Sequence, residues 1–161
     1  ALRNNPHYSA ALKGLGMVRF YQGDLQAAFE GLSLALKADP SSWQTLNAIG
    51  VVHLERGELN QAITSFRQAL RLHPYCSEAH NGLGEVYFRQ DMIDEAIAEY
   101  REALRLDRWA SPSYWNLALA LEKKGRSEEA AACWRRFLEL SRDEADRAMV
   151  IDHLQELQTR H

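Results

Sequence analysis

The stretch "ALKADP" (Ala35–Pro40) returns as "ALRLHP" (Ala69–Pro74) and again as "ALRLDR" (Ala103–Arg108), each time 34 residues further along the chain. The chain also opens on a related stretch, "ALRNNP" (Ala1–Pro6). The same spacing aligns columns of small residues, of which the clearest are Gly16, Gly50, Gly84 and Ala118 in one column and Ala28, Ala62, Ala96 and Ala130 in another. Recurrence in several columns predicts one structural unit repeated along the chain.

Each unit has the pattern of two helices joined by a short turn. The first part carries apolar residues at helical spacing, such as Leu46 and Ile49, and the second does the same with Phe66 and Ala69. The turns between them are "QGDL", "RGEL", "QDMI" and "KGRS". Glycine suits the left-handed backbone that ends a helix, because it has no Cβ to clash. We therefore expect this backbone at Gly23, Gly57 and Gly125, and at Asp91 in the third unit.

These columns resemble the tetratricopeptide repeat (TPR), a helix-turn-helix unit with large and small residues at set positions. The third unit is closest to the pattern, with His80, Leu83, Gly84, Tyr87, Ala96, Tyr100 and Ala103. Departures occur at the tyrosine position, where Arg19, His53 and Leu121 stand, and the fourth unit lacks the closing proline. The resemblance covers residues 9 to about 142. It implies an all-α fold, an α-solenoid whose helix-turn-helix units stack into a right-handed superhelix.

The spacing also gives the expected boundaries. TPR units are predicted at residues 9–42, 43–76, 77–110 and 111–142. Residues 1–8 resemble the tail of a preceding repeat, so we expect the sequence to be a piece of a longer array. Residues 143–161 form one further predicted helix that caps the last unit's apolar face, with Ala145, Met149, Leu154 and Leu157 on one side.

Composition narrows the class of partner. The chain has 161 residues, 25% of them charged, and a net charge of −3, which suggests no general attraction to nucleic acid or to an anionic membrane. No apolar run approaches the roughly 20 residues that a bilayer span needs. We therefore expect no nucleic-acid partner and no membrane insertion. The location stays unknown; Cys76 and Cys133 are expected to be free thiols, which favours a reducing compartment such as the cytoplasm.

No pattern points to catalysis or to a bound metal or cofactor. No two of the six histidines lie three or four residues apart, as a helix-borne metal pair requires. Phosphate-binding glycine motifs and a nucleophile elbow are absent from the sequence. Acidic pairs such as Asp94 and Glu95 begin second helices, where they complement the helix dipole. We expect a protein that is not an enzyme and takes no cofactor.

In the TPR family the first helix of each unit lines the concave face of the superhelix. Carried over by column, the partner-binding residues that the resemblance implies are Lys13, Met17, Tyr21, Gln44, Asn47, Val51, Glu55, Glu78, Asn81, Glu85, Arg89, Trp115, Asn116 and Lys123. Phe20, Leu54 and Phe88 share that side but are expected to pack in the core. Trp134 is expected to be core, and packing is also the favoured interpretation of Trp109, although Trp109 or Trp115 could anchor a ligand.

Asparagines recur on this side, with Asn47 and Asn81 in one column and Asn116 one residue later. A side-chain amide both donates and accepts hydrogen bonds, so a row of them can hold the backbone of an extended peptide whatever its sequence. Repeated asparagines can equally be solvated residues that the repeats inherited. The sequence supports the two interpretations equally.

The family's best-known groove holds a C-terminal carboxylate between lysines, asparagines and an arginine. Lys13 matches one such position, but Met17 stands at an asparagine position, Glu78 at a lysine position and Gly82 at the arginine position. We therefore expect no carboxylate clamp. Charges of both signs on the implied groove favour a partner of mixed polarity.

Three hypotheses of function follow. The leading one is a non-catalytic interaction module or scaffold that binds a peptide or a protein in the concave groove. A second is self-association, possible through the exposed face of the N-terminal repeat. A third is a recruitment or regulatory region of a larger enzyme.

Overall fold

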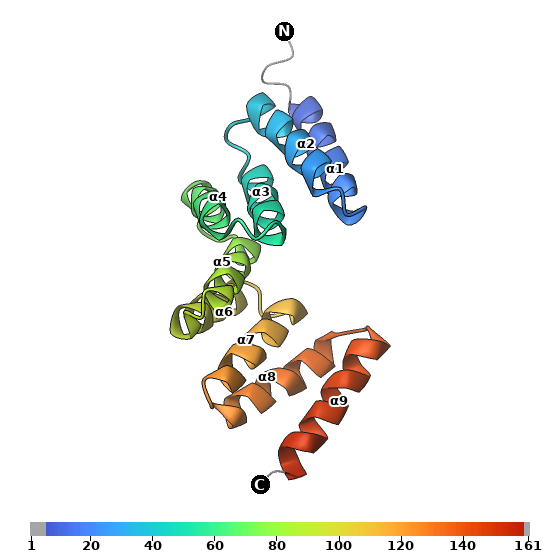
Figure 1. The fold of residues 1–161 in the computed structure, drawn as a ribbon, viewed down its shortest axis with the longest axis vertical. Helices are drawn as coiled ribbons and strands as arrows, with labels where there is room; N and C mark the ends of the chain where they lie inside the picture. Colours follow the sequence, from blue (N-terminus) through green and yellow to red (C-terminus); the bar gives the residue numbers. More distant parts are fainter. Residues whose placement is uncertain (1–5, 160–161) are drawn as a thin grey trace. The chain divides into compact units, whose positions relative to one another are not determined.

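A computed structural model describes residues 6–159, and within that range every regular element is an α-helix. The helices are α1 (Pro6–Tyr21), α2 (Leu25–Ala38), α3 (Trp43–Glu55), α4 (Leu59–Leu72), α5 (Ser77–Arg89), α6 (Ile93–Leu106), α7 (Ser111–Lys123), α8 (Ser127–Leu140) and α9 (Glu144–Thr159) (Figure 1). This confirms the predicted all-α helical repeat solenoid. The chain divides into two compact units, the first ending at Val86 and the second beginning at Tyr87.

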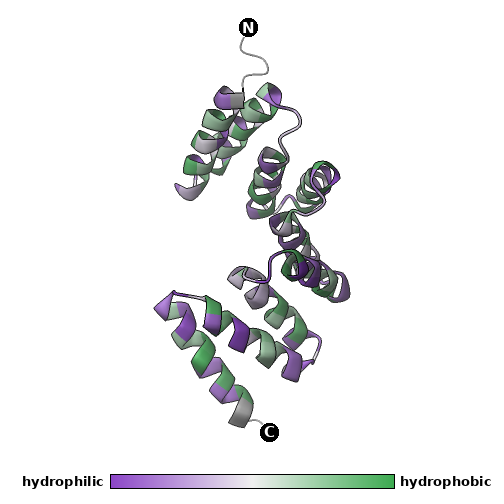
Figure 2. Cartoon of the chain, turned by 180° about the vertical axis from the view of Figure 1, so that it is seen from behind, coloured by the Kyte–Doolittle hydropathy of each residue, from purple (hydrophilic) through white to green (hydrophobic). Residues whose placement is uncertain are grey.

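In the first unit, successive helices pair as antiparallel neighbours. α1 packs on α2 and α3 packs on α4, while α2 also contacts α3. Leu32 and Val52 are completely buried in the cluster between these helices. Each helix carries both hydrophobic and hydrophilic residues along its length (Figure 2), as expected of helices that bury only one side. Stability therefore comes from the stacking of neighbours rather than from any single helix.

Left-handed residues close the first helix of every repeat, as predicted. The φ angles are +81° at Gly23, +73° at Gly57, +64° at Asp91 and +76° at Gly125. In each turn the next N–H donates back to a carbonyl five residues earlier, for example Glu58 N to His53 O at 2.9 Å and Met92 N to Tyr87 O at 2.9 Å. These bonds satisfy carbonyls that the end of the helix would leave without a partner.

The Phe66 ring of α4 fixes the approach of α3 and α5 in the first unit. Phe66 is completely buried. A Cβ added to Gly50 would lie 2.6 Å from Phe66 Cε1, and one added to Gly82 would lie 2.4 Å from Phe66 Cζ. The ring therefore occupies the space that side chains at positions 50 and 82 would otherwise fill. Because both neighbouring helices hold the ring, it cannot move aside for either one.

In the second unit, α7 packs between α6 and α8, and α9 covers α8. Tyr100 and Leu121 lie in one buried cluster, and Trp134, Phe137 and Val150 lie in another. Trp134 is 2% exposed, which confirms it as core.

A hydrogen-bond network fastens α9 to the helices before it. Glu122 Oε1 accepts from Trp134 Nε1 at 2.7 Å and lies 2.7 Å from His153 Nε2. The carboxylate of α7 therefore joins the indole of α8 to the imidazole of α9.

The expected inner face of α9 was partly wrong. Ala145 is exposed and Met149 is 56% exposed, whereas Val150 is 2% exposed and packs with Leu154. Val150, Leu154 and Leu157 follow one another at four and three residues, so they form one stripe, and Met149 lies about 100° away from it around the helix.

The expected packing of Trp109 was also wrong. Its side chain is 58% exposed, with the guanidinium carbons of Arg108 and Arg136 at 4.8 and 5.1 Å from the ring centroid. Cation–π contacts at the surface take the place of burial.

We expect Gly82→Ala to lower the free energy of unfolding by about 1–3 kcal/mol, because the new methyl group collides with the trapped Phe66 ring. Gly14→Ala is the matched control. A Cβ at Gly14 meets nothing within 4 Å, so this change should raise stability by about 0.5–1 kcal/mol through helix propensity alone. Urea titrations followed by circular dichroism measure the free energy of unfolding of both variants. Equal effects of the two substitutions would contradict the packing role of Phe66.

Asp91 should be less favourable than glycine in its turn. Asp91→Gly and Asp91→Ala both remove the ion pair with Lys123, which joins Oδ1 and Nζ at 2.6 Å. Their difference therefore reports the backbone alone. We expect the glycine variant to be more stable by about 1 kcal/mol, since a Cβ is disfavoured at positive φ. The thermal midpoints of the two variants test this, and an alanine variant as stable as the glycine variant would refute it.

Candidate functional site

The predicted partner-binding residues of α3 form a stripe on one side of the helix. Gln44, Asn47, Val51 and Glu55 follow one another at three or four residues, which places them on one helix face. Gln44 and Glu55 are exposed, and Asn47 and Val51 are half-buried. The side-chain oxygen Oδ1 of Asn47 is buried and has no hydrogen-bond partner within residues 6–159.

The first helix of the chain contributes less. Tyr21 is 80% exposed at the end of α1. Lys13 is half-buried, and Met17 packs against the cluster around Leu32 and Val52. Phe20 is partly buried and packs against the same cluster, and Leu54 is 3% exposed, so the expectation that both pack in the core is confirmed. Met17 therefore offers only part of its side chain to a partner.

α5 repeats the spacing of α3 with Glu78, Asn81, Glu85 and Arg89. The carboxylate of Glu78 accepts from Cys76 Sγ at 3.4 Å and Ser77 Oγ at 3.3 Å at the start of the helix. Glu78 and Arg89 are exposed, and Asn81 and Glu85 are half-buried. Of the four, Arg89 alone lies beyond Val86, in the second unit. The stripe of α5 within the first unit is thus acidic with one amide.

In the second unit, Lys123 is held by its own neighbours. Its ammonium group pairs with Asp91 and lies 5.2 Å from the ring centroid of Phe88, which packs on the buried cluster around Tyr100. The column pattern predicted Lys123 to bind a partner, but its ammonium group already makes these contacts within the chain.

Trp115 is fixed by aromatic contacts. Its ring meets those of Trp134 and Phe137 edge to face, with centroids 4.9 and 5.2 Å apart. Such pairs hold a ring in one orientation.

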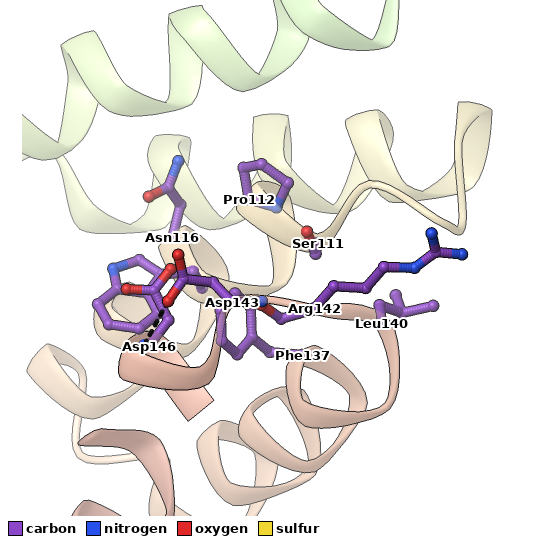
Figure 3. Close-up of a pocket in the computed structure, with 10 residues that line it drawn as sticks. Ser111, Pro112, Asn116, Phe137, Leu140, Arg142, Asp143 and Asp146 are labelled. Atoms are coloured by element: carbon purple, nitrogen blue, oxygen red, sulfur yellow. Dashed lines mark hydrogen bonds between the residues drawn. The ribbon is translucent and has the colours of Figure 1, made fainter. Parts of the chain in front are cut away.

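Trp115 and Asn116 also line a pocket of about 440 Å³ in the second unit (Figure 3). α7 contributes Pro112, Trp115 and Asn116. The opposite side comes from Phe137 and Leu140 of α8 and from Asp143 and Asp146 at the start of α9. This volume falls in the range of roughly 300–1,000 Å³ that is usual for ligand sites.

Only some of the residues that line this pocket are among the predicted partner-binding residues. Trp115 and Asn116 were predicted from the repeat columns, whereas Phe137, Asp143 and Asp146 were not. The sequence did offer one clue to the position of Asp143: an aspartate directly before a helix is a preferred N-cap, so Asp143 could have been placed at the start of α9. Its Oδ1 accepts from Ala145 N at 2.9 Å and Asp146 N at 3.0 Å, as such a cap does.

The described residues offer little for reactive chemistry. Residues 6–159 contain no group of three or more His, Cys, Asp or Glu side chains arranged to hold a metal ion. Both cysteines are free, as predicted, and burial raises the pKa of Cys76 to about 11 and raises that of Cys133 as well. Thiols with raised pKa values stay protonated near neutral pH and are poor nucleophiles. None of the helices in this part of the chain is long and apolar enough to span a membrane.

Paired helices with left-handed turns and small residues at the crossings define a helical-repeat protein. The chain belongs to the tetratricopeptide repeat family, because one TPR family model matches residues 1–42 and 47–111 and a second matches residues 111–144. A search of curated protein sequences gave no significant match.

Solved structures share the fold at low sequence identity. TTC0263, a thermophilic TPR protein of Thermus thermophilus, matches with a TM-score of 0.82 and 20% identity over 94% of this chain and 84% of that one. A crystal structure of MamA matches with a TM-score of 0.71 and 23% identity over 92% and 81%. The first TPR domain of Spaghetti (RPAP3), bound to the HSP90 peptide SRMEEVD, matches with a TM-score of 0.70 and 18% identity over 78% and 99%.

Asn47→Ala should leave stability unchanged or raise it by up to about 1 kcal/mol, because it removes a buried acceptor that has no hydrogen-bond partner among residues 6–159. Asn60→Ala, at an exposed position of α4, controls for helix propensity. Urea titrations of both variants provide the test. A loss of more than about 1 kcal/mol for Asn47→Ala alone would show that its amide stabilises the fold.

Proposed function

We propose that the chain is a non-catalytic interaction module that binds an extended segment of a partner protein along the exposed sides of α3 and α5 in the first unit. The observation that carries this proposal is the stripe of α3, where the half-buried amide of Asn47 has an acceptor without a partner among residues 6–159, and exposed Gln44 and Glu55 lie at the two ends. Because Oδ1 is closed to solvent in the free chain, the Asn47 amide would have to turn outward on binding, and a peptide N–H would then supply the missing hydrogen bond.

The chemistry of α3 suits a peptide backbone better than a particular side chain. An asparagine amide can donate to a backbone carbonyl and accept from a backbone N–H at the same time. Val51, one turn further along, offers apolar contact area, and Gln44 and Glu55 are exposed at the ends of the stripe. The partner is therefore an extended segment held mainly through its backbone.

The residues do not favour a C-terminal carboxylate as the ligand. Position 82 faces the Phe66 ring at a distance that leaves no room for a side chain, so an arginine there could not reach a ligand. Met17 is partly taken up by the core, and Glu78 brings a negative charge. The solved relative RPAP3 holds an HSP90 peptide that ends in "EEVD"; the glutamates of α5 in this chain would repel such an acidic segment.

Self-association is the second candidate, because α1 exposes apolar residues. Leu15 is 53% exposed and Val18 is 52% exposed. Sedimentation velocity over a range of protein concentrations tests this candidate. A single monomeric species at all concentrations would remove it.

Selection from a phage-displayed peptide library tests the interaction module. We expect selected peptides to lose at least about tenfold in affinity for Asn47→Ala/Asn81→Ala, because two hydrogen bonds to the peptide backbone are removed. The matched control is Asn60→Ala/Gln61→Ala on the exposed side of α4, which should bind as the parent protein does. Equal affinities of all three proteins would refute α3 and α5 as the site.

A further inference from the structure

We propose that the pocket between the starts of α7 and α9 recognises a lysine or arginine side chain of a partner protein. The inference rests on the proposed interaction function and names the side chain that the second unit would select. The pocket combines an apolar floor with carboxylates at one end, which is the arrangement that a long cationic side chain fits.

The apolar part suits the methylene stem of such a side chain. Pro112, Trp115, Phe137 and Leu140 line it. Phe137 is 4% exposed, and its ring and that of Trp134 hold Trp115 in place, so this part of the pocket is preformed. A preformed wall lowers the entropic cost of binding. The Trp115 indole can also attract a cation placed over its face.

Two carboxylates and one amide form the polar end. Figure 3 shows Asp143, Asp146 and Asn116 grouped together. Asp143 is held in position because its Oδ1 caps α9. The carboxylate of Asp146, by contrast, is partly buried and has no hydrogen-bond or ion-pair partner within residues 6–159. A partly buried carboxylate beside a second one favours a cation over a neutral or acidic group.

The nearby cations do not neutralise this end. Arg142 also lines the pocket, but Figure 3 shows its guanidinium extended away from the aspartates. Arg147 donates instead to the carbonyls of Leu138 and Ser141, at the end of α8. An incoming ammonium or guanidinium group would therefore meet two carboxylates that no arginine within residues 6–159 has paired.

Short peptide probes test the pocket directly, without the natural partner. The ¹⁵N-labelled protein is titrated with Ac-Gly-Lys-Gly-NH₂ and with the arginine, norleucine and glutamate counterparts, up to about 20 mM because single side chains bind weakly. We expect the lysine and arginine peptides to cause saturable shifts of the Trp115 indole N–H and the Asn116 side-chain amide. Norleucine should bind about tenfold more weakly, since it keeps the stem but lacks the charge. Glutamate should not bind.

Asp146→Asn should weaken the lysine and arginine peptides by about tenfold while the spectrum stays that of a folded protein. Asp152→Asn is the matched control, because it removes the same charge from an exposed position of α9 outside the pocket. The proposal is overturned if norleucine or glutamate binds as well as lysine, if both variants weaken binding equally, or if no probe binds.

These outcomes are separate from those of the proposed function. Peptides selected from the library that depend on Asn47 and Asn81 but not on Asp146 would leave the interaction function standing and remove this pocket. Lysine binding at the pocket, together with a library that yields no peptide, would support the pocket and remove the proposed interaction function of α3 and α5.

Discussion

The first unit depends on one aromatic ring held between two glycines. Phe66 of α4 fills the space beside Gly50 of α3 and Gly82 of α5, and a methyl group on either glycine would overlap with it. This contact sets how closely α3 and α5 approach α4, and so which sides of these helices remain exposed. The stripe of Gln44, Asn47, Val51 and Glu55 faces outward because the opposite side of α3 is committed to this packing. The packing of Phe66 therefore determines both the core of this unit and the side of α3 that is exposed for binding.

In the second unit, a larger aromatic residue takes the position of Phe66, and an additional helix covers the core. Trp134 stands in the column of Phe66, and α9 covers its cluster with Val150 and Leu154. The network of Glu122, Trp134 and His153 ties α9 to α7 and α8. Because α9 begins beside the start of α7, the helix that caps the core also completes a pocket. The capping helix therefore has a structural and a proposed recognition role at once.

The proposed sites of the two units agree in their preference for charge. Glu78 and Glu85 accompany the amide of α5, and Asp143 and Asp146 close the pocket of α9. Each would repel an acidic segment and tolerate or attract a basic one. The proposed preference would set the chain apart from a groove that holds an acidic C-terminal tail, although the fold is shared with a solved domain bound to an HSP90 peptide. Within one repeat family, the identity of a few exposed residues selects the partner, while the buried columns maintain the fold.

The repeat, the helix pairs, the left-handed turns including Asp91 and the burial of Trp134 were all determined by the sequence alone. They depend on local sterics and on columns that recur several times, so each copy supports the others. The tertiary structure alone decided the inner face of α9, because this helix has no repeated copy and carries two apolar stripes, one with Met149 and one with Val150. It also decided that Trp109 lies at the surface, close to the guanidinium groups of Arg108 and Arg136. The pocket could not be predicted because Trp115 and Asp146 are distant in sequence, and only the packing of α9 brings their side chains to one cavity.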